Sequence, residues 1–383
     1  MKVYWGTRLR GFLRHLNHSS KNINFIESQN YYETNSLMNN LKSKIIRSRI
    51  LNVLGIFQII DVKEKECDCY ASFNRFLKTD KPYFIFLENP TALYHYTLGR
   101  NKSYLGKKKF KKCLNDPHLK YIVCMSKACE ESYEKINGQL PLSVKMTTIY
   151  PLVPKNESLK VEDIIKKSQR KCVECLYCVQ GIRFVSKGGL EVLSTFDKLK
   201  AQGMNINLTV ITKLSDLDKK TLNRLQNNEN IKLYDYTLSY DELVKIYENT
   251  NILVQPSSDD SFGLTILEAM KSGCAIIASK LYAFPEMVID EYNGYLIEPK
   301  YWFFDKKNIP NPKVWNHRKK TIYSKKESKI LMDSLIEKIT KLYDDREKLE
   351  TFSTNSLLLA NTKFGVDKIS NEWEKVLAEI TID

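Results

Sequence analysis

The chain has 383 residues, of which 43% are hydrophobic and 27% charged, a composition that suits a globular protein large enough for two domains. No run approaches eighteen apolar residues, which argues against a transmembrane helix. Charged residues close to Met1 fall where a signal peptide needs its apolar segment, so we expect a cytoplasmic protein, and the formal net charge of +15 favours an anionic partner.

Short apolar runs alternate with helical stretches through the first half of the chain, which favours βαβ units and a parallel sheet. Strands are predicted at residues 1–5, 83–87, 121–125 and 146–150. Gly6 follows the first of these strands and Glu88 follows the second, so both are candidates for a site at the strand ends. His95 lies further along the second loop, but a lone histidine beside apolar residues is more often structural.

Two runs in this half combine basic and apolar residues, at positions 41–51 and 100–112. Either run alone is equally well explained as a solvated basic face. The two together favour an anionic membrane surface, where each cation contributes about 1 kcal/mol and where a single weak anchor seldom suffices. No helix-turn-helix, zinc-finger or RNA-recognition motif accompanies the charge, so we do not expect a nucleic acid as the partner.

The lysine-rich stretch at 154–170 interrupts the strand pattern and is predicted as the linker between two domains, at 1–160 and 171–363. In the second half, strands are predicted at 173–179, 206–211, 231–234, 252–254 and 275–278, and an irregular insertion at 300–329. Residues 364–380 have the period of an amphipathic helix, with Ile369, Trp373 and Leu377 on one stripe.

Cys172, Cys175 and Cys178 form a Cys-x-x-Cys-x-x-Cys run, a spacing found in some iron–sulfur and zinc sites. A fourth ligand at a suitable spacing is missing. The run also falls in a predicted strand, where cysteine behaves as a small hydrophobic residue. We therefore favour a buried strand and predict no metal site.

Two loops in the second half have the features of an anion site. In the first, a strand ends at Gly181 and Lys187 stands just before the next helix. In the second, a helix begins near Gly263 and carries Glu268 about one turn in. The free N–H groups at a helix start suit a phosphate or sugar oxygen, and a carboxylate one turn further can accept the two hydrogen bonds of a ribose diol.

Asp260 and Glu268 lie eight residues apart across the second loop. This spacing resembles the acid-x7-acid signature of the family 4 nucleotide-sugar glycosyltransferases, within the glycosyl transferases group 1, which have the GT-B fold. The resemblance continues through the strand at 275–278, Pro285-Glu286 and residues 293–299. It implies an α/β protein with two Rossmann-like domains facing a central cleft, and a C-terminal helix at about 364–383 that crosses back to the first domain.

The resemblance also implies a donor site in the second domain and an acceptor site in the first. Arg183 and Lys187 would hold the donor diphosphate, although Arg183 stands one place later than in the commonest pattern. Glu268 would bind the ribose, while Asp260 would lie near the donor sugar or cap the helix, a role that Asp often has. The further implied residues are Gly6, Phe262, Gly263 and Leu264 at the diphosphate, Tyr236, Thr237 and Leu238 at the base, and Glu88, which joins Asp260, Glu268 and Lys187 as catalytic.

The implied activity is a retaining sugar transfer from a nucleotide diphosphate sugar to a lipid-linked or polysaccharide acceptor in cell-surface glycan synthesis. We recognise no Asp-x-Asp metal motif, and Lys187 with a helix start can take the place of a cation at the diphosphate, so neither metal nor other cofactor is expected. A peripheral position on the inner face of the plasma membrane would suit the basic first domain. The alternatives are a nucleotide-sugar epimerase of the same fold and a non-catalytic scaffold. The abundance of Lys, Asn, Ile and Tyr is typical of an AT-rich bacterial genome.

Overall fold

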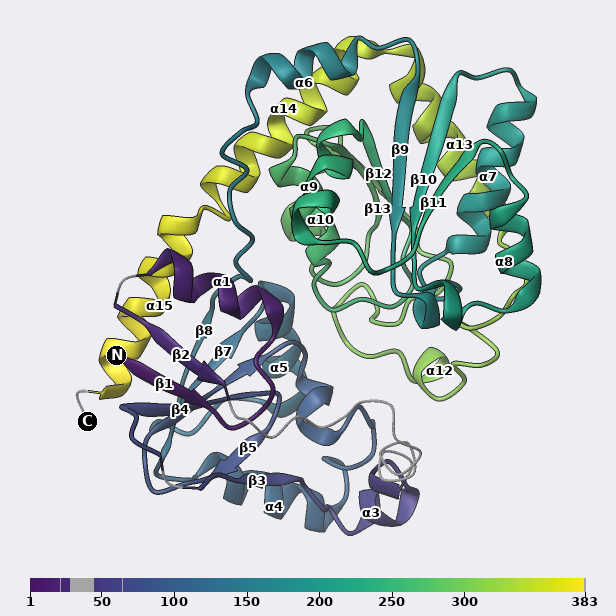
Figure 1. Ribbon diagram of the computed structural model, residues 1–383. Coiled ribbons are helices and arrows are strands. Elements are labelled where there is room, and N and C mark those ends of the chain that lie inside the picture. Colours follow the sequence, from purple (N-terminus) through teal and green to yellow (C-terminus); the bar gives the residue numbers. More distant parts are fainter. Residues whose placement is uncertain (21, 28–44, 64, 382–383) are drawn as a thin grey trace. The chain divides into compact units, whose positions relative to one another are not determined.

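The computed structural model describes residues 1–20, 22–27, 45–63 and 65–381 (Figure 1). The chain divides into two compact units. Unit 1 comprises Met1–Leu152, Lys307–Pro310 and Gly365–Asp383, and unit 2 comprises Val153–Lys306 and Asn311–Phe364. Of the basic run predicted at 41–51, positions 41–44 lie outside the described residues.

Unit 1 is built on a six-stranded parallel sheet in the order β2-β1-β4-β6-β7-β8. Its strands are β1 (Lys2–Trp5), β2 (Asn24–Glu27), β4 (Cys69–Phe73), β6 (Tyr83–Leu87), β7 (Leu119–Cys124) and β8 (Lys145–Thr148). A separate parallel pair joins β3 (Ile59–Asp61) to β5 (Phe76–Lys78). The helices are α1 (Gly11–Ser19), α3 (Arg49–Val53), η1 (Pro90–Tyr94), α4 (Tyr104–Leu114), α5 (Lys127–Asn137) and α15 (Val366–Thr381).

Unit 2 repeats this architecture, with the strand order β11-β10-β9-β12-β13-β14 and parallel pairing throughout. Its strands are β9 (Val173–Cys178), β10 (Ile206–Ile211), β11 (Ile231–Tyr234), β12 (Ile252–Gln255), β13 (Ala275–Ser279) and β14 (Gly294–Ile297). Its main helices are α6 (Val161–Ser168), α7 (Gly189–Ala201), α8 (Lys219–Gln226), α9 (Tyr240–Asn249), α10 (Leu264–Lys271), α13 (Lys329–Asp344) and α14 (Arg346–Thr362). No helix in the described part of the chain is long and apolar enough to cross a membrane.

In each sheet the chain reverses the direction in which it adds strands. In unit 1, β1 lies between β2 and β4; in unit 2, β9 lies between β10 and β12. Such a reversal leaves a crevice outside the carboxyl ends of the two middle strands, where open α/β sheets bind their ligands. The β9/β12 reversal is therefore the first place to look for a site in unit 2.

All nine predicted strands are present, with ends shifted by at most two residues. The structure adds β2, β4 and β14 to the two sheets, each only four or five residues long. β4 is buried along its whole length, but its sequence, Cys69-Tyr-Ala-Ser-Phe73, lacks the β-branched residues that mark a strand. Pairing on both sides selects this strand, and its own sequence does so only weakly.

The stretch at 154–170 is not a simple linker, contrary to the sequence-based prediction. It contains α6, which belongs to unit 2. Ile164 is buried, and the equally buried Lys167 donates from Nζ to the carbonyl of Ser272 at 3.1 Å. Sequence analysis missed the helical period because it counts lysine as a polar residue. A lysine can nevertheless bury its methylene chain and so occupy the inner face of a helix.

The predicted C-terminal helix is confirmed as α15, which packs in unit 1 although it follows unit 2 in the chain (Figure 1). Trp373 on its buried stripe is 1% exposed. The indole ring lies 5.8 Å from the ring of Phe25, 5.4 Å from Phe84 and 5.5 Å from Phe86, measured between centroids. Trp373 thus fastens the end of the chain to the sheet of unit 1.

Replacing Trp373 with alanine tests this fastening. The substitution leaves a cavity among three aromatic rings, so we expect the free energy of unfolding to fall by roughly 3–5 kcal/mol, measured by urea unfolding with far-UV circular dichroism. Trp302→Ala is the matched control, because Trp302 is only partly buried and Lys306 lies over its ring. Equal losses in the two variants would contradict the role given to Trp373.

Candidate functional site

The loops that follow β9 and β12 lie side by side at the strand-order reversal of unit 2 (Figure 1). A hydrogen bond of 2.9 Å from the N–H of Ser258 to the carbonyl of Ser186 joins them. Gly188 has a φ of 81°, and a Cβ at this position would lie 2.7 Å from the carbonyl oxygen of Pro256. A glycine is needed for this approach, which makes one continuous surface of the two loops.

Two ion pairs cross this surface. Lys187 Nζ contacts Asp260 Oδ2, with the side chains only 13% and 17% exposed. Arg183 contacts Asp259 in the same way, with side chains 42% and 10% exposed. Burial opposes the charge of Arg183, but Asp259, Tyr323 and Asp260 outweigh it and raise the pKa of the guanidinium. Two cations thus face two carboxylates, so the charges of these four side chains balance.

The structure thus brings together Arg183, Lys187 and Asp260, three of the residues predicted from the sequence. Asp260 does not cap α10, since Gly263 occupies the N-cap position and Asp260 Oδ1 accepts the N–H of Ser261 at 2.9 Å. Sequence analysis missed Asp259. Two adjacent aspartates in the loop could have indicated a second ion pair, but the sequence does not show which cation each of them contacts.

The start of α10 adds backbone donors to the same loop. Gly263 precedes the helix with a φ of 93°, where a Cβ would lie 2.6 Å from the ring of Phe284. The first N–H groups of a helix, here beginning at Leu264, have no acceptor inside the helix and lie at the positive end of its dipole. Phe262, just before this helix start, is buried.

Glu268 lies one turn into α10 among tyrosines. It accepts a hydrogen bond of 2.9 Å from Tyr247 Oη, and burial raises the pKa of its carboxyl group. Burial, together with the nearby charge of Glu268, also raises the pKa of Tyr236 and that of Tyr240 to about 12. A carboxyl held with a raised pKa is typical of functional sites. Tyr240 and Tyr247 were not predicted, because their positions on α9 give no sign of what they face.

The three residues predicted at a nucleotide base share one loop between β11 and α9. Tyr236 is 50% exposed. Thr237 is exposed and Leu238 partly buried beside it. Asp235 fixes the loop by accepting the N–H of Leu214 at 3.0 Å and that of Tyr236 at 2.8 Å.

In unit 1, Gly6 and Glu88 lie directly after β1 and β6. The N–H of Gly6 donates to Ala71 O at 2.9 Å, and a Cβ at Gly6 would lie 2.9 Å from a methyl group of Val62. Packing alone therefore explains this glycine. Glu88 accepts a hydrogen bond from the hydroxyl of Tyr96. In the sheet order β4 separates their strands, so the two residues are not immediate neighbours.

His95 has a structural position. Its backbone is left-handed, with a φ of 57°, and Nε2 accepts the N–H of Gln58 at 3.0 Å. Burial, with Arg75 and Arg100 nearby, lowers the pKa of the imidazole to about 3. A neutral ring whose Nε2 is already engaged holds the chain around Gln58 in place and is poorly suited to act as a base.

Cys175 and Cys178 of the cysteine run lie on β9, as predicted, and Cys172 directly precedes this strand. Cys175 and Cys178 are buried, Cys172 is partly buried, and all three are free thiols. Within the described ranges, no three His, Cys, Asp or Glu side chains gather in a way that could hold a metal ion. The expectation that the sequence has no Asp-x-Asp motif is wrong, because Asp216 and Asp218 form such a pair. Asp218 caps α8, and Asp216 lies 3.8 Å from Lys213.

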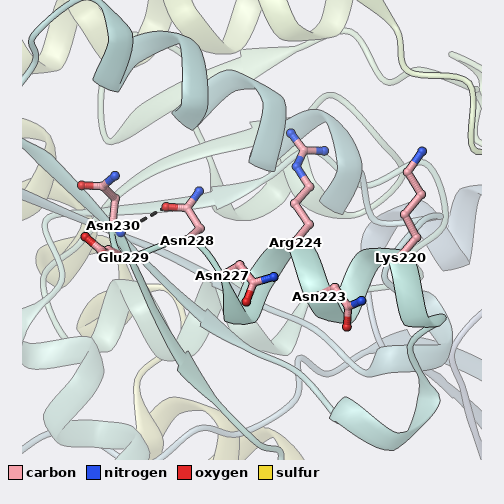
Figure 2. Close-up of a pocket in the computed structure, with 7 residues that line it drawn as sticks. All are labelled: Lys220, Asn223, Arg224, Asn227, Asn228, Glu229 and Asn230. Carbon is pink, nitrogen blue, oxygen red and sulfur yellow. Dashed lines mark hydrogen bonds between the residues drawn. The ribbon is translucent and has the colours of Figure 1, made fainter.

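A hollow of about 690 Å³ runs along α8 into the turn before β11 (Figure 2). It is lined by polar side chains: Lys220, Asn223, Arg224, Asn227, Asn228, Glu229 and Asn230. Arg224 is engaged by Asp197 at 2.7 Å. The hollow reaches the amino end of β11, whereas the loop surface described above lies at the carboxyl ends of the strands, so the two are separate.

Comparison with solved structures defines the fold. HepE of Anabaena, solved in complex with UDP and glucose, matches with a TM-score of 0.59 at 14% identity, over 99% of this chain and 100% of that one. A glycosyltransferase from Rickettsia africae matches with a TM-score of 0.60 at 13% identity, over 99% and 98%. The predicted fold class is confirmed: the chain has the GT-B fold, with a parallel sheet in each unit.

Part of the sequence is similar to a known family. Residues 162–302 match the glycosyl transferases group 1, which supports that family for this chain. A D-inositol 3-phosphate glycosyltransferase of Corynebacterium diphtheriae is 34% identical over 58 residues, which is 15% of this chain and 14% of that protein. An uncharacterized glycosyltransferase of Methanocaldococcus jannaschii is 28% identical over 200 residues, 52% and 46% of the two chains. The matches thus span less than half the length of these relatives.

The raised pKa of Glu268 gives the site a signature in stability. The folded state favours the protonated carboxyl group, so ionising Glu268 costs folding free energy. This cost is absent below the pKa of the unfolded state and grows as the pH rises towards the pKa of the folded state. We expect Glu268→Gln to be more stable than the wild type at pH 7 to 8 and to lose that advantage near pH 4. Thermal unfolding at each pH measures the difference, and each pKa unit corresponds to about 1.4 kcal/mol.

Glu337→Gln on α13 is the matched control. Lys341 and Lys338 lower the pKa of Glu337, so this variant should be slightly less stable than the wild type at neutral pH. If Glu268→Gln instead lost stability at pH 7 and recovered it at pH 4, as the control should, the charged carboxylate of Glu268 would stabilise the fold. That result would contradict its raised pKa.

Proposed function

We propose that this protein is a family 4 glycosyltransferase that takes its sugar from a nucleoside diphosphate sugar. One observation carries the proposal: Lys187 and Arg183 border the loop that leads into α10, and Glu268 lies one turn into that helix, at the strand-order reversal of unit 2. The cations and helix start suit a diphosphate, and the carboxylate suits a ribose diol.

In this proposal the diphosphate displaces Asp260 from Lys187. Its oxygens are bound by Lys187, Arg183 and the N–H groups of Gly263 and Leu264. The released Asp260 carboxylate then accepts hydroxyl groups of the donor sugar. An aspartate reaches roughly 1.5 Å less far than a glutamate, which a bridging water can make good.

The base is proposed to lie at residues 236–238, where the half-exposed ring of Tyr236 offers a stacking surface. UDP and glucose bound to HepE, a protein of similar fold, support a nucleotide and a sugar as ligands here.

Transfer is proposed to retain the anomeric configuration. The bond between the sugar C1 and the phosphate oxygen breaks while the acceptor oxygen bonds to C1 from the same face. The acceptor proton passes to the departing phosphate, so no side chain bonds to the sugar. Lys187 and Arg183 stabilise the charge that grows on the leaving diphosphate, which makes a metal ion unnecessary in this proposal.

The acceptor is proposed to be a lipid-linked or polysaccharide glycan of the cell surface, held by unit 1 with Glu88 among the residues that face it. An anionic membrane surface is the proposed partner of unit 1. The proposed location is therefore the inner face of the plasma membrane, where the protein would bind as a peripheral protein.

A donor screen tests the activity directly. The protein is offered UDP-, GDP- and ADP-sugars with crude lipid acceptors, and nucleotide release is measured. We expect one nucleotide series to react, and Lys187→Ala and Glu268→Ala each to lower kcat/KM by about 100-fold or more, the scale of lost charge stabilisation in a transition state. Lys232→Ala, which removes an exposed lysine of unit 2 paired with Glu174, should react like the wild type.

Three results would contradict the proposal. Full transfer by both site variants would remove the site assignment. Conversion of the donor sugar without any acceptor would indicate an epimerase. Failure of the wild type to bind any nucleoside diphosphate in calorimetry would indicate a scaffold.

A further inference from the structure

Large hydrophobic side chains are exposed in one part of unit 1. Among the described residues of that unit, eight of the nine such side chains fall in two short segments, at 45–59 and at 104–105. They are Ile45, Ile50, Val53, Leu54, Ile56, Ile59, Tyr104 and Leu105, and only Leu142 lies elsewhere. Scattered exposed hydrophobic residues are normal, whereas a concentration of this kind marks a binding surface.

The two segments form one surface, which we call the α3–α4 surface (residues 45–59 and 102–112). The hydroxyl of Ser103 donates to Asn52 O at 3.2 Å, and Lys109 Nζ donates to Leu54 O at 3.1 Å. At Gly55 a Cβ would lie only 2.3 Å from Cα of Gly106. In Figure 1, α3 and α4 lie along the same lower edge of unit 1.

The inner side of this surface is firmly packed. Phe57 stacks on the buried Phe110 of α4 at 5.8 Å between centroids, and Tyr94 lies 5.1 Å from Phe110. The hydrogen bond from Gln58 to His95 holds the same segment. The fold therefore buries Phe110 and partly buries Phe57, while it leaves Ile50, 71% exposed, and Tyr104, 79% exposed, in water.

Positive charge surrounds these apolar side chains. The segment at 102–112 has six exposed lysines: Lys102, Lys107, Lys108, Lys109, Lys111 and Lys112. Arg47 and Arg49 are exposed in the other segment. No Asp or Glu occurs at 45–60 or at 100–115, so no acid in either segment neutralises this charge.

We propose that the α3–α4 surface docks on an anionic lipid bilayer, with Ile50, Val53 and Tyr104 entering the interface and the lysines at the headgroups. The aliphatic and aromatic side chains suit the acyl-chain boundary of such a bilayer, and the surrounding lysines suit its anionic headgroups. A nucleic acid would satisfy the lysines but leave the aliphatic side chains in water. The biological role of the surface rests on the proposed function, because a transferase acting on lipid-linked acceptors must reach the membrane.

Co-sedimentation of the full chain with vesicles tests the docking without donor or acceptor. We expect binding to vesicles of mixed phosphatidylglycerol and phosphatidylcholine, and much weaker binding to phosphatidylcholine alone or in high salt. Lys107→Glu with Lys108→Glu should lower the partition coefficient by about 25-fold or more, since each lysine contributes about fivefold. Ile50→Ser with Tyr104→Ser should lower it by about tenfold or more through lost apolar burial.

Matched controls separate docking from general effects of charge and hydrophobicity. Lys319→Glu with Lys320→Glu makes the same charge change on exposed lysines of unit 2, and Leu142→Ser with Ile330→Ser removes exposed apolar side chains elsewhere. Both controls should bind vesicles like the wild type. All four changes lie at exposed positions, and circular dichroism checks that each variant is folded.

Equal binding to both kinds of vesicle, or equal loss in the variants and their controls, would overturn the proposal. Salt-sensitive binding to duplex DNA without vesicle binding would assign the surface to nucleic acid instead. Transfer to a water-soluble acceptor should be unchanged in the α3–α4 variants. Failure to bind vesicles therefore leaves the proposed transferase intact, and failure of the donor screen leaves the membrane surface intact.

Discussion

Lys187, in the loop after β9, forms an ion pair with Asp260, in the loop after β12. The two loops approach so closely that position 188 requires glycine. The strand order makes this contact possible, because β12 returns to the side of β9 opposite to β10 and brings its own loop alongside. The backbone bond between Ser258 and Ser186 fixes the two loops. The other features of the candidate site, from the Arg183–Asp259 pair to the start of α10, depend on this approach.

The site is balanced in charge and includes a buried acid. Two carboxylates neutralise the two cations, and in the proposed function a diphosphate takes the place of Asp260 at Lys187. Glu268 is buried, which raises the pKa of its carboxyl group, and it accepts a hydrogen bond from the hydroxyl of Tyr247. Natural proteins give up some local stability at functional positions, and a buried ionisable group beside a helix start is such a position.

Sequence analysis located the loops at the strand ends correctly, because short spacing along the chain encodes the strand pattern. Lys187, Asp260 and Glu268 belong to two loop-to-helix segments, and the strand pattern places those segments at strand ends. It failed where a residue is defined by a partner distant in the sequence. Asp259 has its role from Arg183, 76 residues away, and Tyr247 from Glu268 on another helix. The helix at 161–168 was missed because lysine supplied part of its buried face, and the exposure of Ile50 and Tyr104 depends on how α3 packs on α4.

A crystal structure with a bound nucleoside diphosphate tests the central claim most directly. We expect Lys187 Nζ to leave Asp260 for a phosphate oxygen and N–H groups at the start of α10 to contact the diphosphate. Both carboxylate oxygens of Glu268 should accept hydrogen bonds from the ribose hydroxyls. A nucleotide bound elsewhere in unit 2, with the Lys187–Asp260 pair intact and Glu268 still bonded only to Tyr247, would contradict it.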